Sequence, residues 1–178
     1  MAGRKGSEER MHTEPAVAYR GKQDYMGIRT QVAMRRLKAA IPRLLDEVFA
    51  WLEEREVGPA GPPIVRYHVI DMKGTLDVEM GIPVARAMPD DGRVAAGVLP
   101  AGRYASLVFT GVKNGVKANG VLLEWGAQQG LTWDTFEADG GDGFGARFES
   151  TLTHPDEEPD TAKWKIEVAI RLADDPAP

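Results

Sequence analysis

Two glutamates in alternating stretches are the residues of this sequence best placed to bind a ligand. Glu167 lies in residues 164–172 and Glu79 in residues 76–84, and in both stretches apolar and polar residues alternate. Such alternation is typical of a β-strand with one face in a core. We expect each carboxylate on the other face, where the small residue two positions later leaves room for a ligand. The alternative left open is that each glutamate is only a solvated strand residue.

The remaining polar residues do not form a recognisable catalytic or metal motif. The three histidines, His12, His68 and His154, are far apart in the sequence, and a metal site needs several ligands together. The chain has no cysteine, which excludes disulfides, thiolate metal sites and cysteine nucleophiles. It also lacks a phosphate-binding loop and the Gly-x-Ser-x-Gly elbow of serine hydrolases. We therefore expect neither a metal nor another cofactor.

Composition limits the classes of partner. The 178 residues are 43% hydrophobic and 28% charged, as in an ordinary globular domain. The net charge of -5 disfavours nucleic acid and anionic membranes, which attract lysine and arginine, and favours cationic ligands. No apolar run is long enough to span a membrane, and the polar N-terminus lacks the features of a secretory signal. We expect a cytoplasmic protein.

The glutamate strands belong to a longer alternation of strand and helix patterns. Proline at position 42 divides an amphipathic region, so residues 31–56 form either two helices or one broken helix. A second helix is expected over residues 116–129, and residues 134–143 read as a loop. Strands are expected over residues 15–21, 64–70, 76–84, 94–99, 103–110, 144–152 and 163–172.

Three pairs of similar segments indicate an internal repeat. Residues 15–19 resemble residues 100–104, the position of Trp51 resembles that of Trp125, and the two glutamate strands resemble each other. Each repeat then reads strand, helix, strand, strand. We predict an α+β fold in which two such units form a pseudo-twofold antiparallel sheet, with helices on one face and a ligand groove on the other. The predicted boundaries are a flexible segment 1–13 and one domain 14–173, with repeats at about 14–88 and 92–173.

Five stretches, taken in their fixed order, resemble the GyrI-like family of small-molecule-binding domains, which also serve as effector-binding domains of multidrug-responsive transcription activators. The resemblance covers about residues 14–172. The stretches that carry it are residues 51–54, 61–67, 78–84, 99–105 and 164–170.

The resemblance implies a groove between the repeats that binds lipophilic, often cationic compounds. Glu167 matches the position of the family's binding glutamate, and Tyr67 matches a pocket tyrosine. Aromatic faces and a partly buried carboxylate would attract flat cations without a directional pattern of hydrogen bonds. Glu79 joins these residues as a candidate through its strand pattern. Further aromatic candidates for the pocket wall are Tyr104, Trp133, Phe144 and Phe148.

Two other functions stay open. Some stand-alone members of the family are similar to hydrolases that open cyclopropane rings in DNA-alkylating natural products, which would make Glu167 a general base and Tyr67 a hydrogen-bond donor to the oxyanion. An acidic surface could instead bind a protein partner such as gyrase. The residues before Glu14 are too few for a helix-turn-helix, so we expect a free-standing domain that does not bind nucleic acid.

Overall fold

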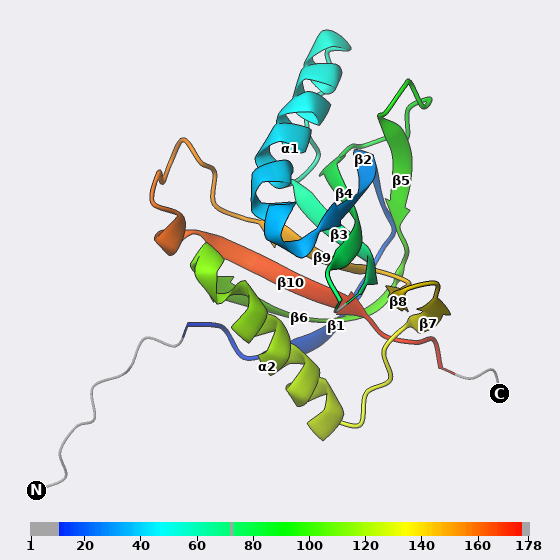
Figure 1. Ribbon diagram of the computed structural model, residues 1–178, viewed down its shortest axis with the longest axis vertical. Coiled ribbons are helices and arrows are strands. Elements are labelled where there is room, and N and C mark those ends of the chain that lie inside the picture. The colour runs from blue at the N-terminus through cyan, green and yellow to red at the C-terminus, as the bar shows by residue number, and fades with distance from the viewer. Residues whose placement is uncertain (1–10, 72, 176–178) are drawn as a thin grey trace, which may run out of the picture.

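One antiparallel sheet runs through the molecule, and each of its halves carries one helix (Figure 1). The computed structural model describes residues 11–71 and 73–175. The main path of the sheet follows the order β1-β6-β10-β9-β3-β4-β2-β5, and a short hairpin, β7–β8, attaches to β3. The strands are β1 Ala16–Arg20, β2 Gln23–Ala33, β3 Ile64–Ile70, β4 Thr75–Pro83, β5 Ala95–Leu99, β6 Gly102–Thr110, β7 Thr135–Ala138, β8 Gly141–Phe144, β9 Arg147–Thr151 and β10 Lys165–Arg171.

Two units with the same order of elements make up this sheet. The first unit is β2, α1 (Leu37–Glu54), β3 and β4, and the second is β6, α2 (Gly115–Gln128), β9 and β10. Strands β3 and β9 join the units through an antiparallel ladder in which Val65 lies opposite Glu149. The predicted α+β class, with its two strand-helix-strand-strand units, is confirmed.

The first strand of each unit is preceded by a strand that pairs with the other unit. β1 leads directly into β2 but pairs with β6, and β5 leads into β6 but pairs with β2. The predicted correspondence of residues 15–19 with 100–104 is therefore wrong. The register makes Tyr25 the counterpart of Tyr104, because each lies opposite the residue four positions after its unit's glutamate.

The helical prediction for residues 31–56 is also corrected at its start. β2 extends to Ala33, a short 3₁₀ turn covers Met34–Arg36, and one unbroken helix follows. Pro42 lies inside that helix, because packing of its apolar face against the sheet outweighs the hydrogen bond that proline cannot make. The predicted loop 134–143 contains the β7–β8 hairpin.

Three groups of buried side chains hold these layers together. Val78, Met80 and Ile82 of β4 pack with α1, and the matching residues of β10 pack with α2, so both helices cover what we call the helix face of the sheet. A third group lies on the opposite, helix-free face, because its members alternate along the strands with those two sets. This helix-free cluster comprises Tyr25, Ile64, Leu99, Tyr104, Ala146, Phe148 and Ala169.

The structure describes only residues 11–13 of the predicted N-terminal segment 1–13. Residues 1–10 lie outside the described part of the chain, but residues 11–13 bond to β6, with Thr13 N–H donating to Val108 O at 2.8 Å. Within residues 11–71 and 73–175, no helix combines the length and the apolar character needed to cross a membrane.

Candidate functional site

Glu167 lies on the helix-free face and is held by an arginine from β1. Arg20 Nη1 donates to Glu167 Oε1 at 2.8 Å and Arg20 Nη2 donates to Oε2 at 3.0 Å, a two-pronged ion pair. A longer bond of 3.3 Å runs from Nη2 to Ser106 Oγ. The Arg20 side chain is 32% exposed and that of Glu167 is 21% exposed, so water reaches the pair.

Two aromatic rings of the helix-free cluster lie beside this ion pair. The Cζ atom of Arg20 lies 5.6 Å from the ring centroid of Tyr104 and 6.0 Å from that of Phe148. The two rings meet edge to face, with centroids 6.0 Å apart and planes at 69°. A carboxylate flanked by aromatic surface is complementary to a planar cation, and here the guanidinium of Arg20 is that cation.

The corresponding carboxylate of the first unit, Glu79, is enclosed by polar side chains. Tyr25 Oη donates to Glu79 Oε1, and the same oxygen accepts from His68 Nε2 at 2.9 Å, since an ionised carboxylate can only accept. Arg66 Nη1 donates to Tyr25 Oη at 3.0 Å and so completes the network. The Glu79 side chain is only 8% exposed.

This network keeps Glu79 ionised despite its burial. Burial alone would raise the pKa of Glu79, but hydrogen bonds from His68 and Tyr25, together with the charge of Arg66, hold that pKa below its ordinary value. Burial, followed by the negative charge of Glu79, raises the pKa of Tyr25 well above the ordinary range. Tyr25 therefore stays a neutral donor.

The small residues near Glu79 make room for Tyr25. A Cβ on Gly81 would lie 2.6 Å from Tyr25 Cδ2, and a Cβ on Gly97 would overlap the end of the same ring. The space that the sequence pattern assigned to a ligand beside Glu79 is thus occupied by a side chain of the protein. The site at Glu167 differs, because its carboxylate and the guanidinium that covers it are both partly exposed.

The predicted site residues fall into two groups on opposite faces of the sheet. Glu167, Tyr104 and Phe148 come together around Arg20, with Glu79 on the same face in the other unit. The remaining three aromatic candidates lie on the helix face. Tyr67 packs with the α1 cluster, and Trp133 and Phe144 pack with the α2 cluster.

Tyr67 and Glu167 therefore do not lie together as the hydrolase alternative requires. Tyr67 shares its face with Arg147 and Glu149, and burial, followed by the negative charge of Glu149, raises the pKa of its hydroxyl well above the ordinary range. A hydroxyl on the helix face cannot reach a substrate held by Glu167 on the helix-free face.

The sequence analysis did not single out Arg20, which pairs with Glu167, Tyr25, which bonds to Glu79, or Arg66, which bonds to Tyr25. It considered His68, which bonds to Glu79, only as a possible metal ligand. Arg20 and Tyr25 flank the connection between β1 and β2, and their role depends on which unit each strand pairs with. The residues after Gly21 read as a polar connection, and only the register of β2 with β4 connects them to Glu79.

Comparison with known families gives one match that covers most of the chain. The sequence model described as the GyrI-like small molecule binding domain matches residues 13–173. No curated protein matches the sequence.

Several solved structures have the same fold at low sequence identity. The C-terminal domain of EcmrR has a TM-score of 0.65 and 16% identity, over 91% of this chain and 98% of that one. In the complex of EcmrR with DNA the TM-score is 0.73 at 14% identity, over 93% of this chain, which spans only 59% of that regulator. SAV2435 bound to tetraphenylphosphonium has a TM-score of 0.58 and 10% identity, over 90% of this chain and 94% of that one. A hydrolase from Listeria innocua has a TM-score of 0.58 and 12% identity, over 90% and 92%.

Proposed function

Because the chain belongs to the GyrI-like family of small-molecule-binding domains, we propose that it binds flat, lipophilic cations at Glu167, with Tyr104 and Phe148 as the aromatic wall. The observation that carries the proposal is the placement of Arg20. Its guanidinium is a planar cation that pairs with the carboxylate and lies within 6.0 Å of both ring centroids. The site thus already holds the kind of group that we expect its ligand to present.

Binding requires that the ligand replace Arg20. The side chain comes from the last residue of β1, beside the connection to β2, and is partly exposed, so it can turn into water without moving the sheet. An exposed ion pair contributes about 0–1 kcal/mol, and each cation–π contact about 0.5–1 kcal/mol when solvent reaches it. A larger aromatic cation would cover more ring surface than a guanidinium and so outweigh this modest loss.

The second glutamate has no part in the proposed binding. Glu79 already accepts hydrogen bonds from Tyr25 and His68. The ring of Tyr25 fills the space that a side chain at Gly81 or Gly97 would occupy. Recruiting Glu79 would leave the hydroxyl of Tyr25 buried without an acceptor, which costs about 1–3 kcal/mol.

One structural neighbour supports a ligand that is lipophilic and cationic. SAV2435 is bound to tetraphenylphosphonium, a lipophilic cation, and shares this fold. The hydrolytic alternative gains no such support from the geometry, because Tyr67 and Glu167 lie on opposite faces of the sheet. We therefore propose binding, rather than turnover, as the activity of this site.

Titration with the cationic dye rhodamine 6G, followed by fluorescence anisotropy, tests the proposal. Arg20→Ala should bind the dye about tenfold more tightly than the unmodified protein, since about 1.4 kcal/mol of internal competition is removed. Adding Glu167→Gln to Arg20→Ala should reverse most of that gain, because the uncompensated carboxylate is lost.

Arg29→Ala is the matched control. Arg29 also forms a two-pronged ion pair on the sheet surface, with Asp77 at 2.9 Å, but it lacks the flanking rings. Its removal should leave dye binding unchanged. Equal dye affinity in Arg20→Ala and in the double variant would contradict the proposed role of Glu167.

A further inference from the structure

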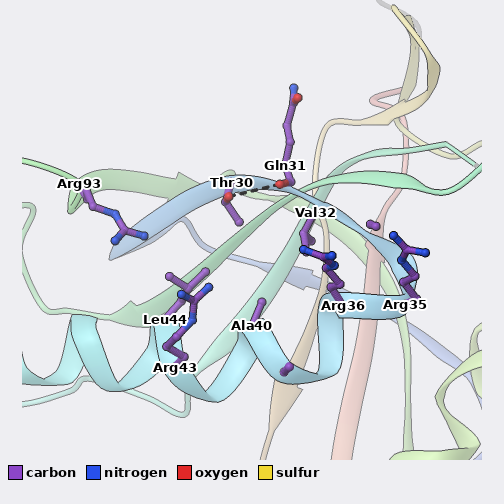
Figure 2. Close-up of a pocket in the computed structure, with 11 residues that line it drawn as sticks. Thr30, Gln31, Val32, Arg35, Arg36, Ala40, Arg43, Leu44 and Arg93 are labelled. Atoms are coloured by element: carbon purple, nitrogen blue, oxygen red, sulfur yellow. Dashed lines mark hydrogen bonds between the residues drawn. The ribbon is translucent and has the colours of Figure 1, made fainter.

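A hollow of about 750 Å³ lies between β2 and the first half of α1, on the helix face and so on the other side of the sheet from Glu167 (Figure 2). Its apolar floor comes from Val32, Ala40 and Leu44. In Figure 2 the side chains of Arg36, at the end of the 3₁₀ turn, and Arg43, on α1, point toward β2, and Arg93 extends into the hollow from the segment before β5. The complete lining is Thr30, Gln31, Val32, Ala33, Arg35, Arg36, Ala39, Ala40, Arg43, Leu44 and Arg93.

The charge of this lining is opposite to that of the whole chain. Four arginines and no acidic residue line the hollow, although the net charge of the protein is -5. Within the described residues, no hydrogen bond or ion pair engages the side chains of Arg35, Arg36 and Arg43. Arg93 alone is paired, with Glu47 at 3.2 Å, and its side chain remains 61% exposed. Like charges gathered without partners repel one another, and a bound anion would relieve that repulsion.

The hollow exists because the outer edge of the first strand is covered over a shorter length in the first unit than in the second. β5 pairs with β2 only as far as Gly27, whereas residues 11–13 extend the cover of β6 up to Thr110. Thr30 and Phe109 correspond, since each lies opposite the residue before its unit's glutamate. In the second unit Phe109 is buried and Met11 packs against its cluster, but in the first unit the smaller Thr30 borders open space.

The start of the helix adds to the positive potential. Neither the 3₁₀ turn at Met34–Arg36 nor α1 has a side-chain cap, and neither has an acidic residue in its first turn. The positive end of the helix dipole at this terminus therefore acts together with the arginines that border it.

We propose that this hollow binds a small organic anion that combines two or more phosphate, sulfonate or carboxylate groups with an apolar body. Arginine pairs with such oxyanions through two parallel hydrogen bonds, and several arginines favour more than one charged group. The apolar floor favours a carbon skeleton over a bare inorganic ion. The site is separate from the proposed cation site, because the sheet lies between Val32 and Glu167.

Pyrene-1,3,6,8-tetrasulfonate, a flat fluorescent anion, is a suitable probe. The unmodified protein should raise its fluorescence anisotropy on binding, and the affinity should fall as salt is added. Arg36→Ala with Arg43→Ala should weaken binding by at least about tenfold, because two direct charge-assisted contacts are lost. Ala39→Glu should weaken it similarly by placing a carboxylate in the hollow at an exposed helical position.

Arg103→Ala is the matched control, since it removes an exposed arginine of the second unit that pairs with Asp175. It should leave the affinity for the tetrasulfonate unchanged, and thermal unfolding should show that all variants are folded. Equal affinity in all four proteins would overturn the proposal. Binding of inorganic pyrophosphate as tight as that of the tetrasulfonate would overturn the assigned role of the apolar floor.

Discussion

The two units of this protein place a glutamate at the same register position and surround it differently. Glu79 lies opposite Arg66 and Glu167 opposite Ser150, in ladders that mirror each other across the β3–β9 junction. Glu79 is nearly buried and accepts from Tyr25 and His68. Glu167 is partly exposed and, in the part of the chain that the structure describes, pairs with Arg20 alone among charged groups.

The difference shows how one strand position can serve structure in one unit and remain exchangeable in the other. The partners of Glu79 are packed into the interior, so removing the carboxylate leaves buried polar groups without acceptors. The partner of Glu167 can be replaced by water. We therefore expect the first unit to depend on its glutamate for stability, and we propose that the second keeps its glutamate open to a ligand.

The largest effect expected from this comparison is that of Glu79→Gln. Loss of the buried charge leaves Tyr25 and His68 competing for a weaker acceptor, and we expect a loss of about 3 kcal/mol in the free energy of unfolding. Glu167→Gln should cost less than about 1 kcal/mol, because its ion pair is open to solvent. Urea unfolding of both variants measures the difference, and equal losses would contradict it.

The dependence on pH provides a control for that prediction. The pKa of Glu79 is lower in the folded protein than in the unfolded chain. Its stabilisation is therefore present at pH values above the ordinary glutamate pKa and is lost as the pH falls through the lowered one. The difference between the unmodified protein and Glu79→Gln should shrink below about pH 4. A constant difference down to pH 2 would point to lost packing instead.

Sequence patterns were sufficient to predict the architecture and the position of both glutamates. Strict alternation around Glu79 and Glu167 requires a strand with the carboxylate on the polar face, and this was correct for both. The patterns gave less information about aromatic residues. Tyr67 and Phe148 lie on neighbouring strands, but one faces the helices and the other does not, and only the pairing of β3 with β9 decides which.

The sequence patterns could not predict that β1 and β5 each pair with a strand of the other unit. Residues 16–20 form a recognisable strand, but nothing local indicates that they pair with β6 rather than with their own unit. Arg20 reaches Glu167 through that exchange, whereas Tyr25 reaches Glu79 through the pairing of β2 with β4 inside the first unit. Partners of a buried or half-buried charge that come from distant parts of the chain depend on tertiary register, which short-range periodicity does not contain.

A smaller effect is expected from filling the space beside the ring of Tyr25. Gly97 lies opposite Tyr25, and the corresponding residue of the second unit, opposite Tyr104, is Ala18. A Cβ at position 97 would overlap the Tyr25 ring, so Gly97→Ala should destabilise the protein by about 1–3 kcal/mol. Urea unfolding measures this loss.

A double-mutant cycle tests whether the ring of Tyr25 is the cause. In a Tyr25→Ala background the overlap disappears, so Gly97→Ala should cost much less than in the unmodified protein. An unchanged cost would mean that the glycine serves the backbone instead. Ala18→Gly gives the comparison in the second unit, where only the backbone term of about 0.5–1 kcal/mol is expected.

The smallest effect is expected for Arg20→Met, which keeps the apolar stem over Tyr104 and removes the charge. We expect a loss below about 1 kcal/mol in urea unfolding, and a smaller loss still at high salt, because solvent and ions already screen the pair. Combining it with Glu167→Gln should give a coupling energy of similar size, since each change alone already breaks the ion pair. A loss above about 2 kcal/mol in the free energy of unfolding would contradict this prediction, because losses of that size are typical of buried ion pairs. Arg20 would then contribute to stability as the partners of Glu79 do. Glu167 would then be held as firmly as Glu79, and a ligand could not displace its partner at a modest cost.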